Sequence, residues 1–73
     1  MIHNNLNLIV DDSWFVKLPG KRIVDEVIIR DISRETVLIE LTDDKNGLAA
    51  FLIELTTTVR YVIKDIEWIE QKP

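Results

Sequence analysis

Apolar and β-branched residues recur in four runs between residues 24 and 64, and polar clusters separate the runs. The runs are Val24–Ile32, Thr36–Thr42, Leu48–Leu55 and Val59–Lys64. The clusters between them are Ser33-Arg34, Asp43–Gly47 and Thr56-Thr57-Thr58, and we expect a turn at each. Asn46-Gly47 is the clearest turn signal because both residues tolerate positive φ. Strand-forming runs bounded by such clusters predict hairpins. We therefore expect a four-stranded antiparallel meander.

One register through three tight loops gives this meander a continuous apolar face. Side chains alternate in direction along a strand, so residues two apart share a face. The register aligns two rows on the same face: Ile29, Val37, Ile53 and Tyr61, and beside them Val27, Ile39, Phe51 and Ile63. Cross-strand neighbours of this kind stabilise a sheet, and we expect these rows to form the core.

The opposite face of the meander is less polar than a solvated face should be. The same register places one apolar row there, formed by Ile28, Leu38, Leu52 and Val62. Beside it runs a charged row of Arg30, Thr36, Glu54 and Arg60, in which Glu54 lies opposite Arg60. An exposed apolar stripe on a small protein commonly marks a contact surface. We expect an interface here, with Trp68 extending it; in the alternative, Trp14 and Trp68 both plug the ends of a barrel.

The third run, Leu48–Leu55, also fits a helix. It contains good helix formers, and Asp43 or Asp44 could cap it. Its apolar residues Leu48, Phe51, Leu52 and Leu55 would share one helical face. A helix at this position would remove the middle of the predicted register, and the sequence leaves both alternatives open.

The flanking segments predict shorter elements. A short strand is expected at Leu6–Val10, a turn at Asp11-Asp12-Ser13, and another strand at Trp14–Leu18 that ends at the turn dipeptide Pro19-Gly20. After the meander, Ile63, Ile66 and Ile69 recur every three residues, which suits one 3₁₀ turn followed by a short final strand.

Size and composition limit the classes of protein to which this chain can belong. The 73 residues predict a single domain over 1–73, and 47% of them are hydrophobic. The chain has no cysteine and one histidine, which excludes disulfides, Cys-based zinc sites and His-rich metal clusters. A domain this small is marginal alone, and oligomerisation is the common remedy. The net charge of −4 suits phosphate backbones poorly. No membrane-length apolar run or signal-peptide pattern is evident, so we expect a soluble, cytoplasmic homo-oligomer without cofactor or metal.

The closing stretch from Tyr61 to Ile69, Tyr61-Val62-Ile63-Lys64-Asp65-Ile66-Glu67-Trp68-Ile69, carries a resemblance. A meander of four strands, a single 3₁₀ turn and a short final strand resembles the SH3-like small β-barrel over Val24 to Ile69. A likeness at the level of topology implies a fold and names no function. The plasmid-borne type II dihydrofolate reductases are SH3-like tetramers with a similar closing stretch. Their active-site segment Val-Gln-Ile-Tyr is replaced here by Val59-Arg60-Tyr61, which lacks the glutamine.

Three short segments invite a chemical interpretation, and each has a simpler structural one. Asp43–Gly47 resembles a calcium loop, but alignment on Gly47 puts Thr42 first and supplies no distal glutamate, so a hairpin turn fits better. Asp11-Asp12 could be paired acid–base carboxylates, although such pairs need burial and a solvated turn is expected. His3 could act as a base, but no partner for it is evident.

Five basic residues that could gather beside Trp14 and Phe15 suggest a clamp for single strands. Aromatic side chains stack on bases while cations follow the backbone. Lys17, Lys21, Arg22, Arg30 and Arg60 are the cations, and interleaved acidic residues weaken their field. The candidate ligand or nucleic-acid contacts are Trp14, Lys17, Arg22, Arg60 and Tyr61.

The combined pattern favours a non-catalytic, self-associating protein-interaction module with a homo-oligomeric or other protein partner. A nucleic-acid-associated small barrel is the alternative. A third class is a small oligomeric enzyme whose site forms only at a symmetry axis lined by Tyr61 and Arg60. The sequence does not indicate the partner or the oligomer number.

Overall fold

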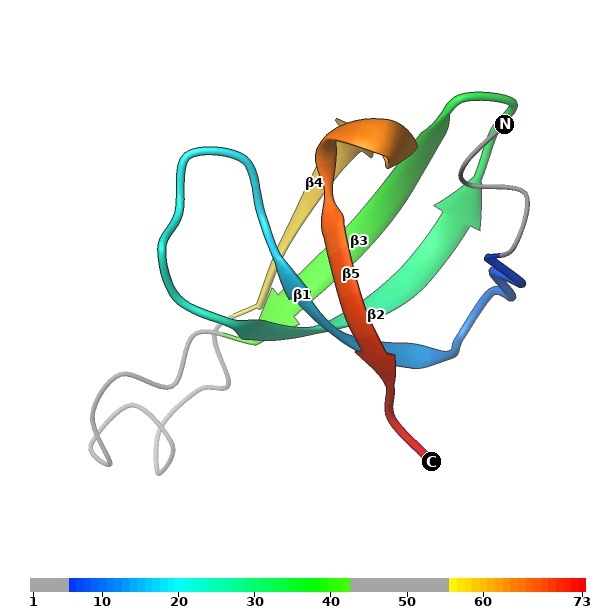
Figure 1. Cartoon of the computed structure of the whole chain (residues 1–73). Helices are drawn as coiled ribbons and strands as arrows, with labels where there is room; N and C mark the ends of the chain where they lie inside the picture. The colour runs from blue at the N-terminus through cyan, green and yellow to red at the C-terminus, as the bar shows by residue number, and fades with distance from the viewer. Residues whose placement is uncertain (1–5, 43–55) are drawn as a thin grey trace.

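A computed structural model describes residues 6–42 and 56–73 of the chain (Figure 1). These residues form one antiparallel sheet with the strand order β4-β3-β2-β1-β5 and one 3₁₀ turn, η2. The bounds are β1 Ser13–Lys17, β2 Asp25–Ile32, β3 Thr36–Thr42, β4 Thr56–Val62, η2 Ile63–Asp65 and β5 Glu67–Gln71. The predicted mainly β fold, with a 3₁₀ turn before a short final strand, is confirmed.

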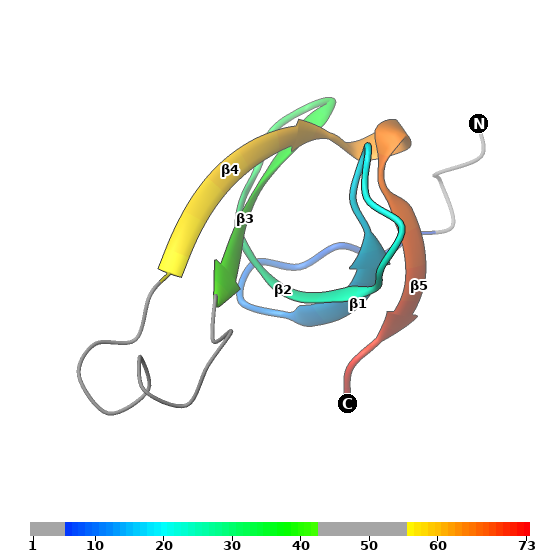
Figure 2. The same ribbon diagram turned by 90° about the vertical axis from the view of Figure 1, so that its left-hand side faces the viewer.

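The sheet is strongly curved without being closed into a barrel. Figure 2 shows β4 and β3 on one side and β1 and β5 on the other, with η2 joining β4 to β5 at the top. The end strands β4 and β5 do not pair with each other among the described residues. The concave side holds the core, whose buried members are Trp14, Val16, Leu18, Val27, Ile29, Val37, Ile39, Ile63 and Ile66.

Strand β1 contributes more to this core than the sequence pattern indicated. Its burial alternates, and Trp14, Val16 and the following Leu18 are buried. The chain then reverses in a tight turn, in which the Lys21 N–H donates to the Leu18 carbonyl at 3.0 Å. Pro at the second position and Gly20 at the third, with φ of 82°, are the residues that a type II turn requires. The predicted Pro19-Gly20 turn is confirmed.

Strand β3 pairs directly with β4, which corrects the predicted register. Val37 lies opposite Tyr61 and Ile39 lies opposite Val59. The cross-strand partners of Val37 are Ile32 and Tyr61, so the predicted row with another strand between β3 and β4 is wrong; Ile53 itself is not among the described residues. The segment Leu48–Leu55, and with it the choice between strand and helix, lies outside the described residues. The four-stranded meander exists, but its members are β1 to β4.

A β-bulge in β2 explains why the predicted pairing of β2 with β3 is displaced. Ile29 lies opposite Ile39 rather than Val37, and the register shifts between Ile29 and Asp31, which leaves Arg30 as the extra residue. A bulge inserts one residue and changes which side chains share a face. Ile29 is buried and Ile32 also packs against the core, three positions later instead of two. The predicted core face is nevertheless correct at Val27, Ile29, Val37, Ile39 and Ile63, all of which are buried, while Tyr61 packs against them half-buried.

Two local predictions fail at strand boundaries. Thr56-Thr57-Thr58, expected as a turn, forms the first three residues of β4. Threonine is β-branched and fits a strand well, so the three residues extend the run that begins at Val59. The short strand expected at Leu6–Val10 is absent: residues 6–9 are irregular and Val10 and Asp11 form a turn.

Candidate interaction surface

The outer edge of β4 is open in the described part of the chain. Because β4 is an end strand of the sheet, only β3 pairs with it there. All seven residues, Thr56–Val62, pair with β3 in an unbroken register. Figures 1 and 2 show β4 at the margin of the curved sheet. Its side away from β3 therefore presents backbone groups that no described strand satisfies.

The pairing pattern decides which residues of β4 present those groups. The Ile63 N–H donates to the Glu35 carbonyl at 2.8 Å, which makes Ile63 and Glu35 a hydrogen-bonded pair. In an antiparallel ladder such pairs alternate with non-hydrogen-bonded pairs. Tyr61 and Val59 therefore bond to β3 through the backbone. Thr58 and Arg60, with Thr56 and Val62 at the ends, direct their backbone N–H and C=O groups outward.

The other edge, on β5, is less suited to pairing. β5 has five residues, and its register with β1 shifts opposite Phe15 and Val16, so Ile69 is left without a partner. Bulges and charged side chains are the usual means by which an edge strand avoids pairing with another chain. β5 has the bulge and two glutamates, Glu67 and Glu70. β4 has no proline, no bulge and one charged residue, Arg60.

The Arg60 guanidinium is held by groups of its own chain. Its Nη2 lies 3.1 Å from Asp31 Oδ2, and its Nη1 donates to Thr36 Oγ1 at 3.0 Å. Asp31 and Arg60 are the two cross-strand neighbours of Leu38. Their ion pair therefore crosses β3 at the position of Leu38, which is half-buried. The chain itself shields part of this aliphatic side chain.

A second group of charged side chains, centred on Arg30, lies on the outer face next to the Asp31–Arg60 ion pair. Arg30 Nη1 lies 2.8 Å from Asp11 Oδ1, and Arg30 Nε lies 2.9 Å from Glu40 Oε1. The hydrogen bond to Glu40, and then the one to Asp11, raises the pKa of the Arg30 guanidinium. The bulge makes this arrangement possible, because it places Arg30 and Asp31 consecutively on the solvent side, where each binds a different strand.

The predicted apolar stripe is therefore interrupted. Ile28, Leu38 and Val62 are half-buried residues of the outer face, as expected. Their cross-strand partners are polar, however: Ile28 faces Glu40, Leu38 faces Arg60, and Val62 faces Thr36. They follow a diagonal across the sheet instead of a row. Leu52 lies outside the described residues, and the interface role of this set stays a prediction.

Trp68 faces the core, which corrects its predicted place in the stripe. It lies opposite Val16, which is fully buried, and directly opposed residues share a face of the sheet. Its ring packs edge-to-face on Trp14, with centroids 5.2 Å apart and planes at 80°. The Trp68 Nε1 donates to the Ile63 carbonyl at 3.1 Å. Both tryptophans therefore contact the core, as in the alternative that has them plug the ends of a barrel, although the sheet is not closed into a barrel.

The large apolar side chains most exposed to solvent lie elsewhere on the molecule. Ile69 is the unpaired residue of β5, and two others precede β2. They are Ile9, Val10, Ile23, Val24 and Ile69, of which Ile23 is 64% exposed. Sequence reasoning did not single them out as surface residues, because only the pairing of β1 with β2 and β5 determines which positions the sheet leaves uncovered.

The basic and aromatic residues proposed as a ligand or nucleic-acid site are not brought together. Trp14 is buried, and Tyr61 faces the core opposite Val37. Lys17 lies on β1 opposite Glu67, and Arg22 is exposed in the loop before β2. Of the remaining cations, Lys21 lies 3.3 Å from Asp25, while Arg30 and Arg60 bind carboxylates as described above. No basic surface results from these residues.

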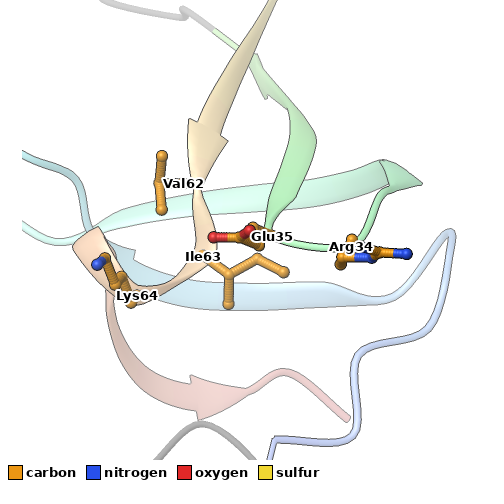
Figure 3. A pocket seen from close by; sticks show the side chains of 5 residues that line it. All are labelled: Arg34, Glu35, Val62, Ile63 and Lys64. Atoms are coloured by element: carbon orange, nitrogen blue, oxygen red, sulfur yellow. The ribbon is translucent and has the colours of Figure 1, made fainter.

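Two recesses on the described surface are small. The first lies between the β2–β3 turn and η2 and has a volume of about 30 Å³ (Figure 3). Arg34 and Lys64 lie on opposite sides of it, and Glu35, Val62 and Ile63 line the rest. This volume is about that of one water molecule.

The second recess is larger and acidic. It has a volume of about 200 Å³ and is lined by Asp25, Glu26, Ile28, Glu40 and Leu41. Ligand pockets usually measure about 300–1,000 Å³. Each of its carboxylates also has a cationic partner, since Lys21 binds Asp25, Lys72 binds Glu26 and Arg30 binds Glu40.

Of the three segments with a possible chemical role, two lie outside the described residues, and in the third the two carboxylates bind different partners. The carboxylates of Asp11 and Asp12 diverge, since Asp11 binds Arg30 and Asp12 accepts a hydrogen bond from Gln71 at 2.7 Å. They are not an acid–base pair. The turn expected at Asp11-Asp12-Ser13 lies nearer the N-terminus, because Val10 and Asp11 form it and Ser13 begins β1. His3 and Asp43–Gly47 lie outside the described ranges. Within residues 6–42 and 56–73, no three acidic, histidine or cysteine side chains gather in a way that could hold a metal ion.

Comparison with known proteins gives no relative for this chain. No protein-family model matches it, and neither a curated protein nor a solved structure shows significant similarity to it. Among the described residues, none of the helical segments has the length and apolar character needed to cross a membrane.

Proposed function

We propose that this protein is a non-catalytic protein-interaction module that associates with itself through its β-sheet. The observation that supports this most is the outer edge of β4. A regular edge strand without proline or bulge is a template on which another strand pairs. Such pairing extends the sheet through backbone hydrogen bonds, a common mode of protein recognition.

The size of the domain supports the same proposal. Domains of this size leave a large share of their apolar surface exposed and gain stability by association. The chain has no cysteine, so disulfides do not supply that stability. The five exposed apolar side chains, Ile9, Val10, Ile23, Val24 and Ile69, are further apolar area that association could cover.

We also propose that the fold is an SH3-like small barrel left open between β4 and β5. The order of β1 to β4 as a meander, followed by η2 and the short β5, supports the resemblance. Small barrels of one topology serve many functions, so the likeness does not choose between them.

Light scattering coupled to gel filtration, over a wide range of protein concentrations, tests the proposal. We expect the mass to rise with concentration from one chain of 8.5 kDa toward a defined multiple of it. A mass of one chain at every concentration up to the solubility limit would contradict self-association.

A further inference from the structure

We infer that two copies of this chain pair through β4 in an antiparallel arrangement about a twofold axis, with Thr56 of one copy opposite Val62 of the other. This inference rests on the proposed self-association and specifies its partner and geometry. A twofold interface uses the same surface on both copies, so β4 must be complementary to itself. Two properties of β4 determine whether it can pair with itself: which residues direct their backbone groups outward, and which side chains would lie opposite each other.

The backbone restricts the register to a few choices. The outward groups belong to the even-numbered residues of β4, so a new ladder must place even residues opposite even residues. Pairing Thr56 with Val62 achieves this and overlaps all seven residues of the strand. Thr58 then lies opposite Arg60 of the other copy. Registers displaced by two residues in either direction shorten the overlap.

The side chains favour the same register. A register displaced toward the C-terminus would place Arg60 directly opposite Arg60 of the other copy. Like charges directly opposite each other destabilise a sheet. The full-length register places each Arg60 opposite Thr58 instead. On the core side it sets Val59 beside Val59 and Tyr61 beside Thr57. Val59 and Tyr61 are half-buried in one chain, so apposed copies would cover them further.

The second edge of the sheet is the competing partner for β4. A head-to-tail contact between β4 and β5 would generate a ring or a filament instead of a dimer. β5 offers two glutamates that could attract Arg60, but Arg60 already binds Asp31 at 3.1 Å. The bulge at Ile69 also breaks the regular spacing that a new ladder needs.

A proline at position 58 separates the edge contact from the fold. The Thr58 N–H points outward and donates nothing to β3, and proline is tolerated on edge strands where the N–H faces solvent. We expect Thr58→Pro to retain the near-ultraviolet circular dichroism of the packed Trp14–Trp68 pair and to lose the dimer completely. Thr58→Val keeps the N–H and the β-branched shape, and we expect it to remain dimeric.

The outcomes distinguish this inference from the broader proposal. A folded Thr58→Pro variant that still forms a dimer overturns pairing through β4 and leaves self-association standing. A wild-type chain that stays monomeric overturns both. If Thr58→Pro does not fold, cross-linking decides the question.

Single cysteines test the register, because the wild-type chain has none. In the full-length register Val59 meets its own copy as a non-hydrogen-bonded pair, with Cα atoms about 4.5 Å apart. That separation lies within disulfide range. Thr57 and its copy would be four residue steps apart, about 13 Å. We expect mild oxidation to cross-link Val59→Cys at least tenfold faster than Thr57→Cys, although Thr57 is the more exposed. Equal rates, or faster cross-linking of Thr57→Cys, would overturn the register.

Discussion

At the scale of single residues, the two tryptophans of the core differ in one hydrogen bond. Trp68 Nε1 donates to the Ile63 carbonyl, whereas the buried Trp14 Nε1 has no partner among the described residues. A net hydrogen bond contributes about 1 kcal/mol, and an unsatisfied buried donor costs about 1–3 kcal/mol. Replacing either indole with the isosteric 3-benzothienyl group removes only the donor. We expect chemical denaturation to show a loss of about 1 kcal/mol at position 68 and no loss, or a gain, at position 14.

The two positions act as controls for each other, since the ring shape is unchanged in both. An equal loss of stability at Trp14 and Trp68 would mean that the Trp14 donor has a partner after all.

A second prediction at this scale concerns the ion pair that crosses β3. Both side chains are about half exposed, at 42% for Arg60 and 54% for Asp31, so solvent weakens the attraction. We expect a double-mutant cycle of Arg60→Met with Asp31→Asn to give a coupling of about 0.2–1 kcal/mol. The coupling should fall in high salt. The control cycle, Arg22→Met with Asp31→Asn, should give none. A coupling well above that range would mean that the pair is far less solvated than its exposure indicates.

At the scale of secondary-structure elements, the bulge in β2 determines which side chains reach the core. Deleting Arg30 leaves Ile29 opposite Ile39, Asp31 opposite Leu38 and regular alternation between them, so the core is preserved. Deleting the neighbouring Ile28 instead shifts the start of the strand by one position, which turns Val27 outward and Glu26 inward. A one-residue slip of this kind moves every affected side chain to the other face.

We therefore expect the Arg30 deletion to unfold cooperatively on heating and the Ile28 deletion to show no cooperative transition. Circular dichroism measures both. A cooperative transition in the Ile28 deletion, or its loss in the Arg30 deletion, would show that the register of β2 does not depend on the bulge.

At the scale of the whole molecule, the sequence predicted the class of fold and most of the buried positions of β2 and β3, because alternating burial along a strand is a local property. It predicted that β2 and β3 are neighbours, but it did not predict that β4 pairs directly with β3 or that β1 lies between β2 and β5. The three threonines at 56–58 resemble a turn when considered locally, but pairing with β3 makes them strand. The same limit applies to the surface: Ile28, Leu38 and Val62 were correctly placed on the outer face, but the charged side chains between them follow from pairing and from the bulge.

The edge of β4 could not be predicted for the same reason. An edge exists only relative to the order of strands, and that order depends on long-range pairing. Once β4 is known to be an end strand, the sequence Thr56–Val62 becomes informative, since it contains no proline and Arg60 is its single charged residue.

Amide hydrogen exchange along β4, measured by nuclear magnetic resonance at low and at high protein concentration, tests this account most directly. In dilute solution we expect Val59, Tyr61 and Ile63 to be protected by β3, while Thr58 and Arg60 exchange freely. At high concentration Thr58 and Arg60 should become protected as well, because a second β4 accepts their N–H groups. Thr58 and Arg60 amides that exchange equally fast at both concentrations, in a sample whose mass has doubled, would contradict pairing through this edge.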